Sequence, residues 1–272
     1  MSEAYSITFI GAGNMAMSLV KGLHQGHPDL RLTVADPINE QLANYESLQV
    51  TTTSDNQAAI ADADVVVLAV KPQVAGDVFA NLTLAPHQLL ISIAAGLNLA
   101  ALATWISESL PIVRCMPNTP ALLGVGMSAL FANEHCDELM RLRAVDILTA
   151  AGETVWVNQE SDLDAVTAVS GSGPAYFFQL MEAMIDAGAE LGLDRETATK
   201  LTLQAAYGAA LMAMETGDAP ATLRANVTSP GGTTQAALEI MQAQGLPGIV
   251  RDALARAAAR SVELAEDFGP KG

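Results

Sequence analysis

Residue types that serve the commonest site chemistries are scarce in this sequence. Its 272 residues include only two cysteines, Cys115 and Cys136, and four histidines. Neither a CxxC nor an HxxxH spacing occurs, whereas zinc sites and disulfide frameworks depend on such clusters. We therefore expect two reduced thiols and no bound metal.

Basic residues and long apolar runs are scarce as well. Lys and Arg number 13 against 30 Asp and Glu, a net charge of -17, which argues against nucleic acid because phosphate binding needs clustered basic side chains. Apolar residues make up 50% of the chain, yet no run reaches the ~18 residues of a membrane span. The N-terminal MSEAYSITF lacks the features of a signal peptide, so we expect a cytoplasmic protein with no membrane partner. The apolar excess favours a subunit interface, and hence a homo-oligomer.

Two patterns divide the chain. Residues 1–159 alternate β-rich runs with helical spacing, which predicts a doubly wound, mainly parallel α/β sheet. The predicted strands are SITFI, RLTVAD, VVVLAV, LLISIA, IVRCMP and a last one near ETVWV. Residues 160–272 carry helical patterns, several of them apolar nearly all round, which is typical of buried or interface helices. The helices predicted there cover 160–192, 195–216, 219–226, 233–244 and 247–267.

The stretch ITFIGAGNMAMSLVKGL joins a predicted strand to a predicted helix through a G-x-G-x-x-G/A fingerprint. We expect Gly11 to allow a tight turn, Gly13 to let a pyrophosphate approach the backbone, and Ala16 to let the helix pack on the strand. The free N–H groups and partial positive charge of a helix start stabilise an anion without any basic residue. The fingerprint in this context predicts a dinucleotide-binding Rossmann domain.

Three further segments end predicted strands at the ligand-binding edge of such a sheet. Asp36 follows Ala16 by twenty residues. Its carboxylate would accept hydrogen bonds from the ribose hydroxyls and repel a 2′-phosphate, which favours NADH. The alternative is that Asp36 only begins an Asp-Pro turn. Lys71, in AVKP, either contacts the cofactor or substrate or is a solvated loop end. The small residues Ala94 and Ala95, in SIAAG, either leave room for a nicotinamide ring or form a tight turn.

The segment TSPGGTT, at 228–234, precedes another predicted helix. Pro230 restrains the chain, the two glycines leave the backbone open, and Thr233 or a neighbour can cap the helix. This pattern predicts a nest of N–H groups suited to a carboxylate. The alternative is a plain helix cap.

Several blocks together carry a resemblance to a known family: GAGNMA, AVKP, SIAAG, RCMPNTP, DAVTAVSGSGPAY and TSPGGTT. The chain resembles pyrroline-5-carboxylate reductases nearly end to end, and the last two blocks are specific to that family. The resemblance implies a Rossmann domain at 1–159 and an all-helical substrate and dimerisation domain at 160–272. It also implies reduction of the cyclic imine 1-pyrroline-5-carboxylate to L-proline, the last step of proline biosynthesis, by NADPH or NADH. The expected assembly is a homodimer, in some members built further into a ring of dimers.

The resemblance also assigns roles to residues. The cofactor contacts that it implies are Gly11, Ala12, Gly13, Asn14, Met15, Ala16, Asn56, Ala69, Val70, Lys71, Pro72, Ala94, Ala95 and Asn226. The substrate contacts that it implies are Ser229, Gly231, Gly232, Thr233 and Thr234, with the Thr234 hydroxyl as the catalytic group against the ring nitrogen. Asp36 departs from the small or basic residues that many members have there, which favours NADH in this chain. Glu160 is a lesser candidate near the substrate; from its sequence context it belongs, with Asp162 and Asp164, to the solvated first turn of a helix.

The second half is poor in histidine, cysteine and lysine. Residues 151–272 contain no histidine or cysteine, and Lys200 is their only lysine before the tail. A ketone reductase usually needs a strong proton donor, whereas an imine can be protonated in solution before hydride transfer, so imine reduction fits better. Two alternatives stay open: a hydroxy-acid dehydrogenase, which would need a catalytic lysine between Glu160 and Gly192, and a dinucleotide-binding protein without turnover.

Overall fold

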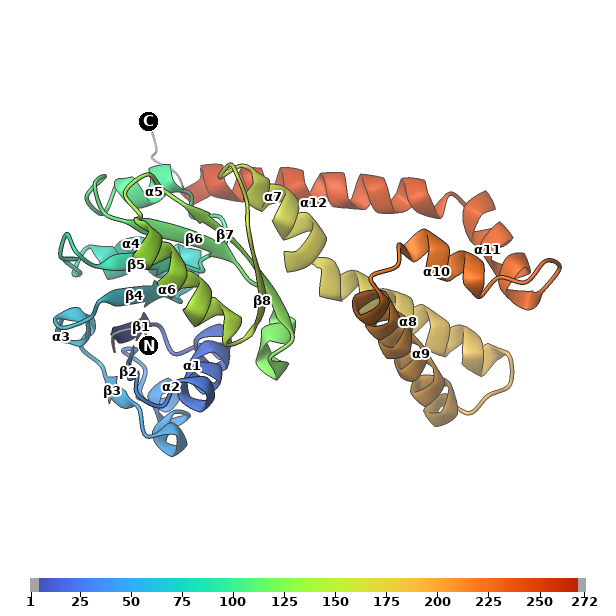
Figure 1. The fold of residues 1–272 in the computed structure, drawn as a ribbon, viewed down its shortest axis with the longest axis horizontal. Helices are drawn as coiled ribbons and strands as arrows, with labels where there is room; N and C mark the ends of the chain where they lie inside the picture. The colour runs from blue at the N-terminus through green and yellow to red at the C-terminus, as the bar shows by residue number, and fades with distance from the viewer. Residues whose placement is uncertain (1–4, 269–272) are drawn as a thin grey trace. The chain divides into compact units, whose positions relative to one another are not determined.

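An eight-stranded sheet organises the first part of the chain. The computed structural model describes residues 5–268, and its strand order is β3-β2-β1-β4-β5-β6-β7-β8 (Figure 1). The strands are β1 Ser6–Ile10, β2 Arg31–Ala35, β3 Thr51–Thr53, β4 Val65–Leu68, β5 Leu89–Ser92, β6 Ile112–Met116, β7 Gly126–Ala132 and β8 Gly152–Trp156. All neighbouring strands run parallel except β6 and β7, which are antiparallel. The mainly parallel, doubly wound sheet predicted from the sequence is confirmed.

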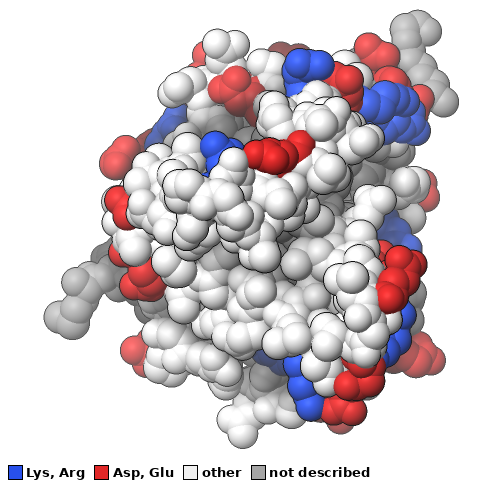
Figure 2. Space-filling model, turned by 90° about the vertical axis from the view of Figure 1, so that its right-hand side faces the viewer, with Lys and Arg blue, Asp and Glu red and all other residues white. Residues whose placement is uncertain are grey.

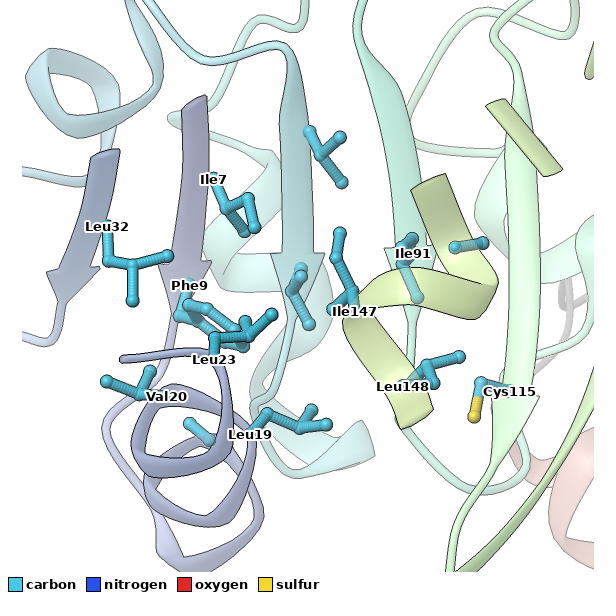
Figure 3. Close-up of a cluster of buried hydrophobic side chains, with 14 of the residues drawn as sticks. Ile7, Phe9, Leu19, Val20, Leu23, Leu32, Ile91, Cys115, Ile147 and Leu148 are labelled. Atoms are coloured by element: carbon cyan, nitrogen blue, oxygen red, sulfur yellow. The ribbon is translucent and has the colours of Figure 1, made fainter. Parts of the chain in front are cut away.

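Helices cover both faces of this sheet. The helical segments are α1 Asn14–Gly26, α2 Asn39–Ala43, η1 Glu46–Leu48, α3 Asn56–Ile60, α4 Pro72–Phe79, α5 Leu99–Ala103, η2 Thr119–Leu123, α6 Glu138–Thr149, α7 Asp162–Val166 and the π-helical turn η3 Thr167–Gly171. Because side chains alternate along a strand, Ile7 and Phe9 of β1 face α1 and α6, as Figure 3 shows. Ile10 faces the other way and belongs to the core beneath α3, α4 and α5. Burial on both faces explains why runs such as Val65–Leu68 are apolar throughout.

The chain divides into two compact units, which we describe separately. The first contains the sheet and extends to Ser172, together with the chain from Arg256 onward; the second spans Gly173–Ala255. The domain boundary at 159/160 stays a prediction.

The second unit is entirely helical. Its segments are α8 Gly173–Glu190, α9 Arg195–Thr216, α10 Pro220–Asn226, α11 Thr233–Ala243 and the first part of α12 Leu246–Phe268. Helices α8 and α9 pack against each other, and Gly188 allows the approach of Ala198, which lies 3.2 Å from where a β-carbon of residue 188 would be. The helix predicted over 160–192 is wrong in one respect: the chain forms α7, a π-helical turn and α8 in its place.

Large apolar side chains are exposed on the second unit. They include Phe177, Leu201, Tyr207, Met214 and Ile240. Figure 2 shows a face on which uncharged residues predominate. Helices that are apolar on more than one side need a further surface to bury them. Among residues 5–268, no helix has the length and apolar character required to cross a membrane.

Candidate active site

The turn after β1 can be made only by glycine. Gly11 has φ +102°, and its N–H donates to the Ala35 carbonyl at 2.7 Å. A β-carbon at this position would lie 2.7 Å from the carbonyl oxygen of Ala69. Side-chain-bearing residues rarely adopt such a φ, and the contact would overlap the end of β4. The tight turn expected at Gly11 is therefore present, and close packing on the AVKP segment is a second reason for it.

The start of α1 presents free backbone donors. Gly13 is the N-cap residue, and among residues 5–268 no side chain caps it. Met17 makes the first intrahelical hydrogen bond, to the Gly13 carbonyl at 3.0 Å, so the amides of Asn14, Met15 and Ala16 precede the helical ladder. The space that a β-carbon of Gly13 would occupy has no described atom within 4 Å. Ala16 is completely buried, as expected for a helix packed closely on its strand.

Asp36 binds the glycine turn directly. Its Oδ2 accepts the Ala12 N–H at 2.9 Å and its Oδ1 accepts the Ile38 N–H at 2.9 Å. The Asp-Pro turn foreseen as the alternative is thus formed, and the same carboxylate also contacts the glycine turn after β1. The cofactor role of Asp36 stays a prediction.

Tyr45 contacts the glycine turn after β1, and the sequence did not predict this contact. This residue follows α2, is completely buried, and its hydroxyl donates to the Gly13 carbonyl at 3.4 Å, a long hydrogen bond. Burial, and then the negative charge of Asp36, raise the pKa of the Tyr45 phenol, so it stays neutral. The signal available in the sequence was the one aromatic residue of the EQLANYESL segment.

Asn56 supplies a buried polar atom that fits a sugar hydroxyl. It begins α3, just beyond β3, and the Asp36 N–H donates to Thr53 at the end of that strand at 3.2 Å. Its side-chain Oδ1 is buried and, within the described part of the chain, accepts no hydrogen bond. Buried acceptors without donors are uncommon in folded proteins. A ribose hydroxyl of a dinucleotide would satisfy this one.

The carboxyl ends of β4 and β5 lie at the same edge of the sheet. Ala69 donates its N–H to Ile10 at 2.8 Å, and Lys71 is the exposed N-cap residue of α4, with Pro72 following it. After β5, Ala94 is buried, Ala95 is exposed, and Gly96 has φ +78°. The SIAAG segment is thus a tight turn with a small side chain at its surface. Whether Lys71, Ala94 and Ala95 contact the cofactor stays a prediction.

The helix turn expected to contain three carboxylates includes Asp162 and Asp164, in the first turn of α7, but not Glu160, for which the expectation is wrong. Glu160 Oε1 accepts hydrogen bonds from Arg114 Nη1 and from the Leu99 N–H, both at 2.6 Å. Asp164, within α7, accepts the Ser261 hydroxyl of α12 at 2.7 Å. Asp162 accepts the N–H of Gln159 at 3.0 Å. Two of the three carboxylates therefore connect different elements of the first unit.

The π-helical turn is a second feature that sequence reasoning missed. The Ser172 N–H donates to the Thr167 carbonyl five residues back, at 2.8 Å. Asn118, in the RCMPNTP segment, donates to the carbonyl and hydroxyl oxygens of Ser170 at 3.2 Å each. A β-carbon at Gly171 would lie 2.5 Å from Cε of Met116. Such turns occur frequently at functional sites, and the glycine-rich SGSG was the available signal.

The TSPGGTT segment forms a second helix start without a side-chain cap. Gly232 is the N-cap residue of α11, Thr233 is its first helical residue, and no side chain among the described residues caps it. The cap expected from Thr233 or a neighbour is therefore not made. Gly231, just before Gly232, has φ +68°. Its N–H donates to Gln235 Oε1 at 2.7 Å, and Gln235 Nε2 donates to Glu239 at 2.8 Å.

The remaining predicted contacts also lie in the second unit. Ser229 accepts the Gly232 N–H through its carbonyl at 3.0 Å, Thr234 lies in the first turn of α11, and Asn226 ends α10 with an exposed side chain. The substrate and cofactor roles of these residues stay predictions.

Both cysteines are inert by their surroundings. Cys115 and Cys136 are free and buried. Burial raises the pKa of the Cys115 thiol to about 12 and that of the Cys136 thiol to about 11. Since the thiolate is the reactive form, neither is a nucleophile in this fold.

The glycine turn after β1, the free start of α1 and the strand ends beside it are the features of a dinucleotide-dependent oxidoreductase. Comparison with known proteins agrees. Residues 6–96 match the family model "NADP oxidoreductase coenzyme F420-dependent", and residues 160–264 match "Pyrroline-5-carboxylate reductase dimerisation".

Full-length relatives narrow this class to one family. A pyrroline-5-carboxylate reductase of Pseudomonas aeruginosa is 52% identical over 97% of this chain and 98% of its own. A solved pyrroline-5-carboxylate reductase from Coxiella burnetii has 40% identity and a TM-score of 0.90, over 97% of this chain and 99% of its own. The enzyme of Plasmodium falciparum, solved with NADP bound, has 31% identity and a TM-score of 0.83, over 97% and 99%. The chain belongs to the pyrroline-5-carboxylate reductase family, whose members are NAD(P)-dependent oxidoreductases.

Proposed function

We propose that this chain reduces 1-pyrroline-5-carboxylate to L-proline with a nicotinamide cofactor. The observation that carries the proposal is the start of α11. It lies in the TSPGGTT segment, has a glycine N-cap, and no side chain among residues 5–268 occupies its first-turn donors. A helix start of this kind favours a carboxylate, which is the charged group of the proposed substrate.

The dinucleotide would be held mainly by uncharged groups. The amides of Asn14, Met15 and Ala16 would bind the pyrophosphate. Asp36 and Asn56 would accept hydrogen bonds from the adenosine ribose, with the unpaired Oδ1 of Asn56 as the supporting observation. The turn at Ala94 and Ala95 would leave room for the nicotinamide ring. When bound, the cofactor supplies the hydride.

The substrate would be held at the second helix start. The free first-turn N–H groups of α11, beginning with that of Thr233, would bind its carboxylate beside Gly232, and the Thr234 hydroxyl would hydrogen-bond the ring nitrogen. Hydride adds to the imine carbon and the C=N bond becomes a single bond, with the nitrogen carrying the proton it gained beforehand. The protein then has mainly to orient the ring, which accords with the absence of histidine and cysteine in residues 151–272.

Asp36 supports a preference for NADH. A carboxylate that already lies beside Ala12 would repel the 2′-phosphate of NADPH. The Plasmodium falciparum relative was solved with NADP. Asp36 in this chain would shift the balance toward the cofactor without that phosphate.

We also propose that the chain acts as a homodimer through its second unit, with a ring of dimers as a further level of assembly. The match of residues 160–264 to a dimerisation model and the exposed apolar side chains of α8 and α9 support the dimer. The cytoplasmic location stays a prediction.

One assay tests the reaction and the cofactor together. The loss of absorbance at the nicotinamide band is followed with pyrroline-5-carboxylate, using NADH and NADPH side by side. We expect turnover with both and a higher kcat/KM with NADH. Higher kcat/KM with NADPH would refute the role given to Asp36. Binding of either cofactor without turnover would favour a dinucleotide-binding protein, and oxidation of a 2-hydroxy acid would favour the dehydrogenase alternative.

A further inference from the structure

Three segments that are far apart in the sequence meet at one carboxylate. Glu160 Oε1 accepts a hydrogen bond from Arg114 in β6 and another from the N–H of Leu99, the first residue of α5. The Arg114 side chain is 13% exposed and that of Glu160 28% exposed. The pair is therefore shielded from water far more than the other carboxylate pairs of Arg and Lys, in which each side chain is at least 44% exposed.

The pair lies at the ligand-binding edge of the sheet. Arg114 is the register partner of Ser92, the last residue of β5. It lies two residues beyond Ile112, so its side chain is on the face that α3, α4 and α5 cover. Ser92 Oγ is itself buried and, within residues 5–268, makes no hydrogen bond. The turn that contains Ala94 and Ala95 begins immediately after Ser92.

Glu160 holds the far end of that same turn. The turn starts where β5 ends at Ser92 and closes at Leu99, whose N–H the carboxylate binds. In the same helix, the Ala101 N–H donates to Asn98 Oδ1 at 2.7 Å. Arg114 fixes the carboxylate relative to β6, because its Nη1 donates to Glu160 Oε1 at 2.6 Å. The pair thus clamps both the turn and the strand next to it.

We propose that Glu160, oriented by Arg114, is a positioning residue that holds the Ala94–Ala95 turn in the shape that receives the nicotinamide ring. This inference rests on the proposed function, because that function places the ring at this turn. Glu160 touches neither the cofactor nor the substrate in this account. Its effect reaches the ring only through the Leu99 N–H.

The test separates positioning from stability by replacing the pair in three ways. Glu160→Gln keeps an acceptor oxygen for Leu99 and Arg114. Glu160→Met removes the acceptor and leaves Arg114 buried without a partner. The double variant Glu160→Met with Arg114→Met removes the unpaired charge as well, which commonly restores stability, while Leu99 still has no acceptor. Glu134→Gln is the matched control, because that side chain is 88% exposed and its carboxylate lies 3.8 Å from His135 Nε2.

Two ligands report on the two halves of the dinucleotide site. NADH carries the nicotinamide ring, and ADP-ribose lacks it but keeps the adenosine and the pyrophosphate. For the double variant we expect a Tm near that of the wild type, a Kd for NADH raised about tenfold, and an unchanged Kd for ADP-ribose. With pyrroline-5-carboxylate, kcat should fall about tenfold. Glu160→Gln should stay within about threefold of the wild type in each quantity.

Other outcomes would overturn the proposal. If the double variant recovers its Tm and binds NADH as the wild type does, the pair serves stability alone. If the affinities for NADH and ADP-ribose fall equally, the effect is not directed at the ring. If Glu160→Gln raises the Kd for NADH as much as Glu160→Met does, the acceptor for the Leu99 N–H is not what positions the turn. The binding measurements need no substrate, so a wild type that binds NADH without reducing pyrroline-5-carboxylate would refute the proposed function and leave this test valid.

Discussion

The two glycine-rich helix starts, at Gly13 and Gly232, have the same local geometry and differ in the charge of one neighbouring side chain. Each helix has a glycine N-cap and no side-chain cap among residues 5–268. In each, the amide just before that glycine donates to a side chain: Ala12 to Asp36 at 2.9 Å, and Gly231 to Gln235 at 2.7 Å. The acceptor is therefore a charged carboxylate at the first start and a neutral carboxamide at the second.

Four other helices, α3, α5, α6 and α9, are capped by a side chain, whereas no described side chain caps α2, α4, α7 or α10. Asp55, Asn98, Asp137 and Asp194 each accept an N–H from the first turn of the helix that they begin. Glycine in place of such a cap costs stability but leaves donors free. The comparison teaches that the two helix starts where we propose anions to bind combine a glycine N-cap with first-turn donors that no described side chain caps. The negative charge of Asp36 lies beside the first start, where the proposed ligand carries sugar hydroxyls.

The largest expected effect concerns the hydroxyl at the second start. Thr234→Ala should lower kcat with pyrroline-5-carboxylate by about 100-fold, because the ring would lose the hydroxyl that orients its nitrogen for hydride transfer, and change the free energy of unfolding by less than about 1 kcal/mol. Thr234→Ser should retain most of the activity, because it keeps the hydroxyl. Steady-state kinetics and urea unfolding check both quantities. Unchanged kinetics in Thr234→Ala would remove this residue from the mechanism.

The two glycines of the first start should respond differently to alanine. Gly11→Ala should destabilise the fold by about 1–3 kcal/mol, because it forces a side chain into a positive φ and against Ala69. Gly13→Ala has open space and should cost less than about 1 kcal/mol. It should nevertheless raise KM for NADH, since the β-carbon would stand where the pyrophosphate approaches. Urea unfolding followed by cofactor titration measures both. Equal destabilisation by the two substitutions would contradict the geometry described for this turn.

The charge at the first start is testable by an isosteric change. Asp36→Asn keeps an oxygen for the Ala12 N–H and removes the charge that would face a 2′-phosphate. We expect the ratio of kcat/KM for NADPH to that for NADH to rise about tenfold, because one charge contact near a surface is worth about 1 kcal/mol or somewhat more. The thermal midpoint serves as the control for folding. A ratio that does not move would remove Asp36 from cofactor choice.

The smallest expected effect comes from giving the second start the charge of the first. Gln235→Glu would place a carboxylate beside the amides proposed to bind the substrate carboxylate. KM for pyrroline-5-carboxylate should rise about twofold to fivefold, because exposed like charges repel by about 1 kcal/mol or less. Gln235→Met, which removes the acceptor without adding charge, should have a smaller effect. A KM that is equal in both variants would show that charge at this position is irrelevant.

Much of the sheet could be predicted because its strands are buried on both faces. Val65–Leu68 and Leu89–Ser92 are continuous apolar or nearly apolar runs, which is a strong signal. Strand β3 was missed because Thr51–Thr53 is three threonines at the sheet edge, with no apolar residue to mark it. Strand β7, antiparallel to β6, was missed because GMSALFA mixes small and polar residues with apolar ones.

The candidate site was only partly visible in the sequence, because local motifs do not reveal distant contacts. The turns at Gly11 and Gly232 follow from their own sequence neighbourhoods. The contacts of Glu160 with Leu99 and Arg114 span 61 and 46 residues, so Glu160 was taken for part of a solvated helix turn. The support of Gly13 by Tyr45 spans 32 residues and was missed for the same reason.

The most direct test of the account is a crystal structure of the enzyme with NADH and proline bound together. The account predicts the pyrophosphate against the amides of Asn14 to Ala16, and the proline carboxylate against the amides at the start of α11 with the Thr234 hydroxyl near the ring nitrogen. A structure with both ligands bound in which either helix start contacts neither of them would contradict it.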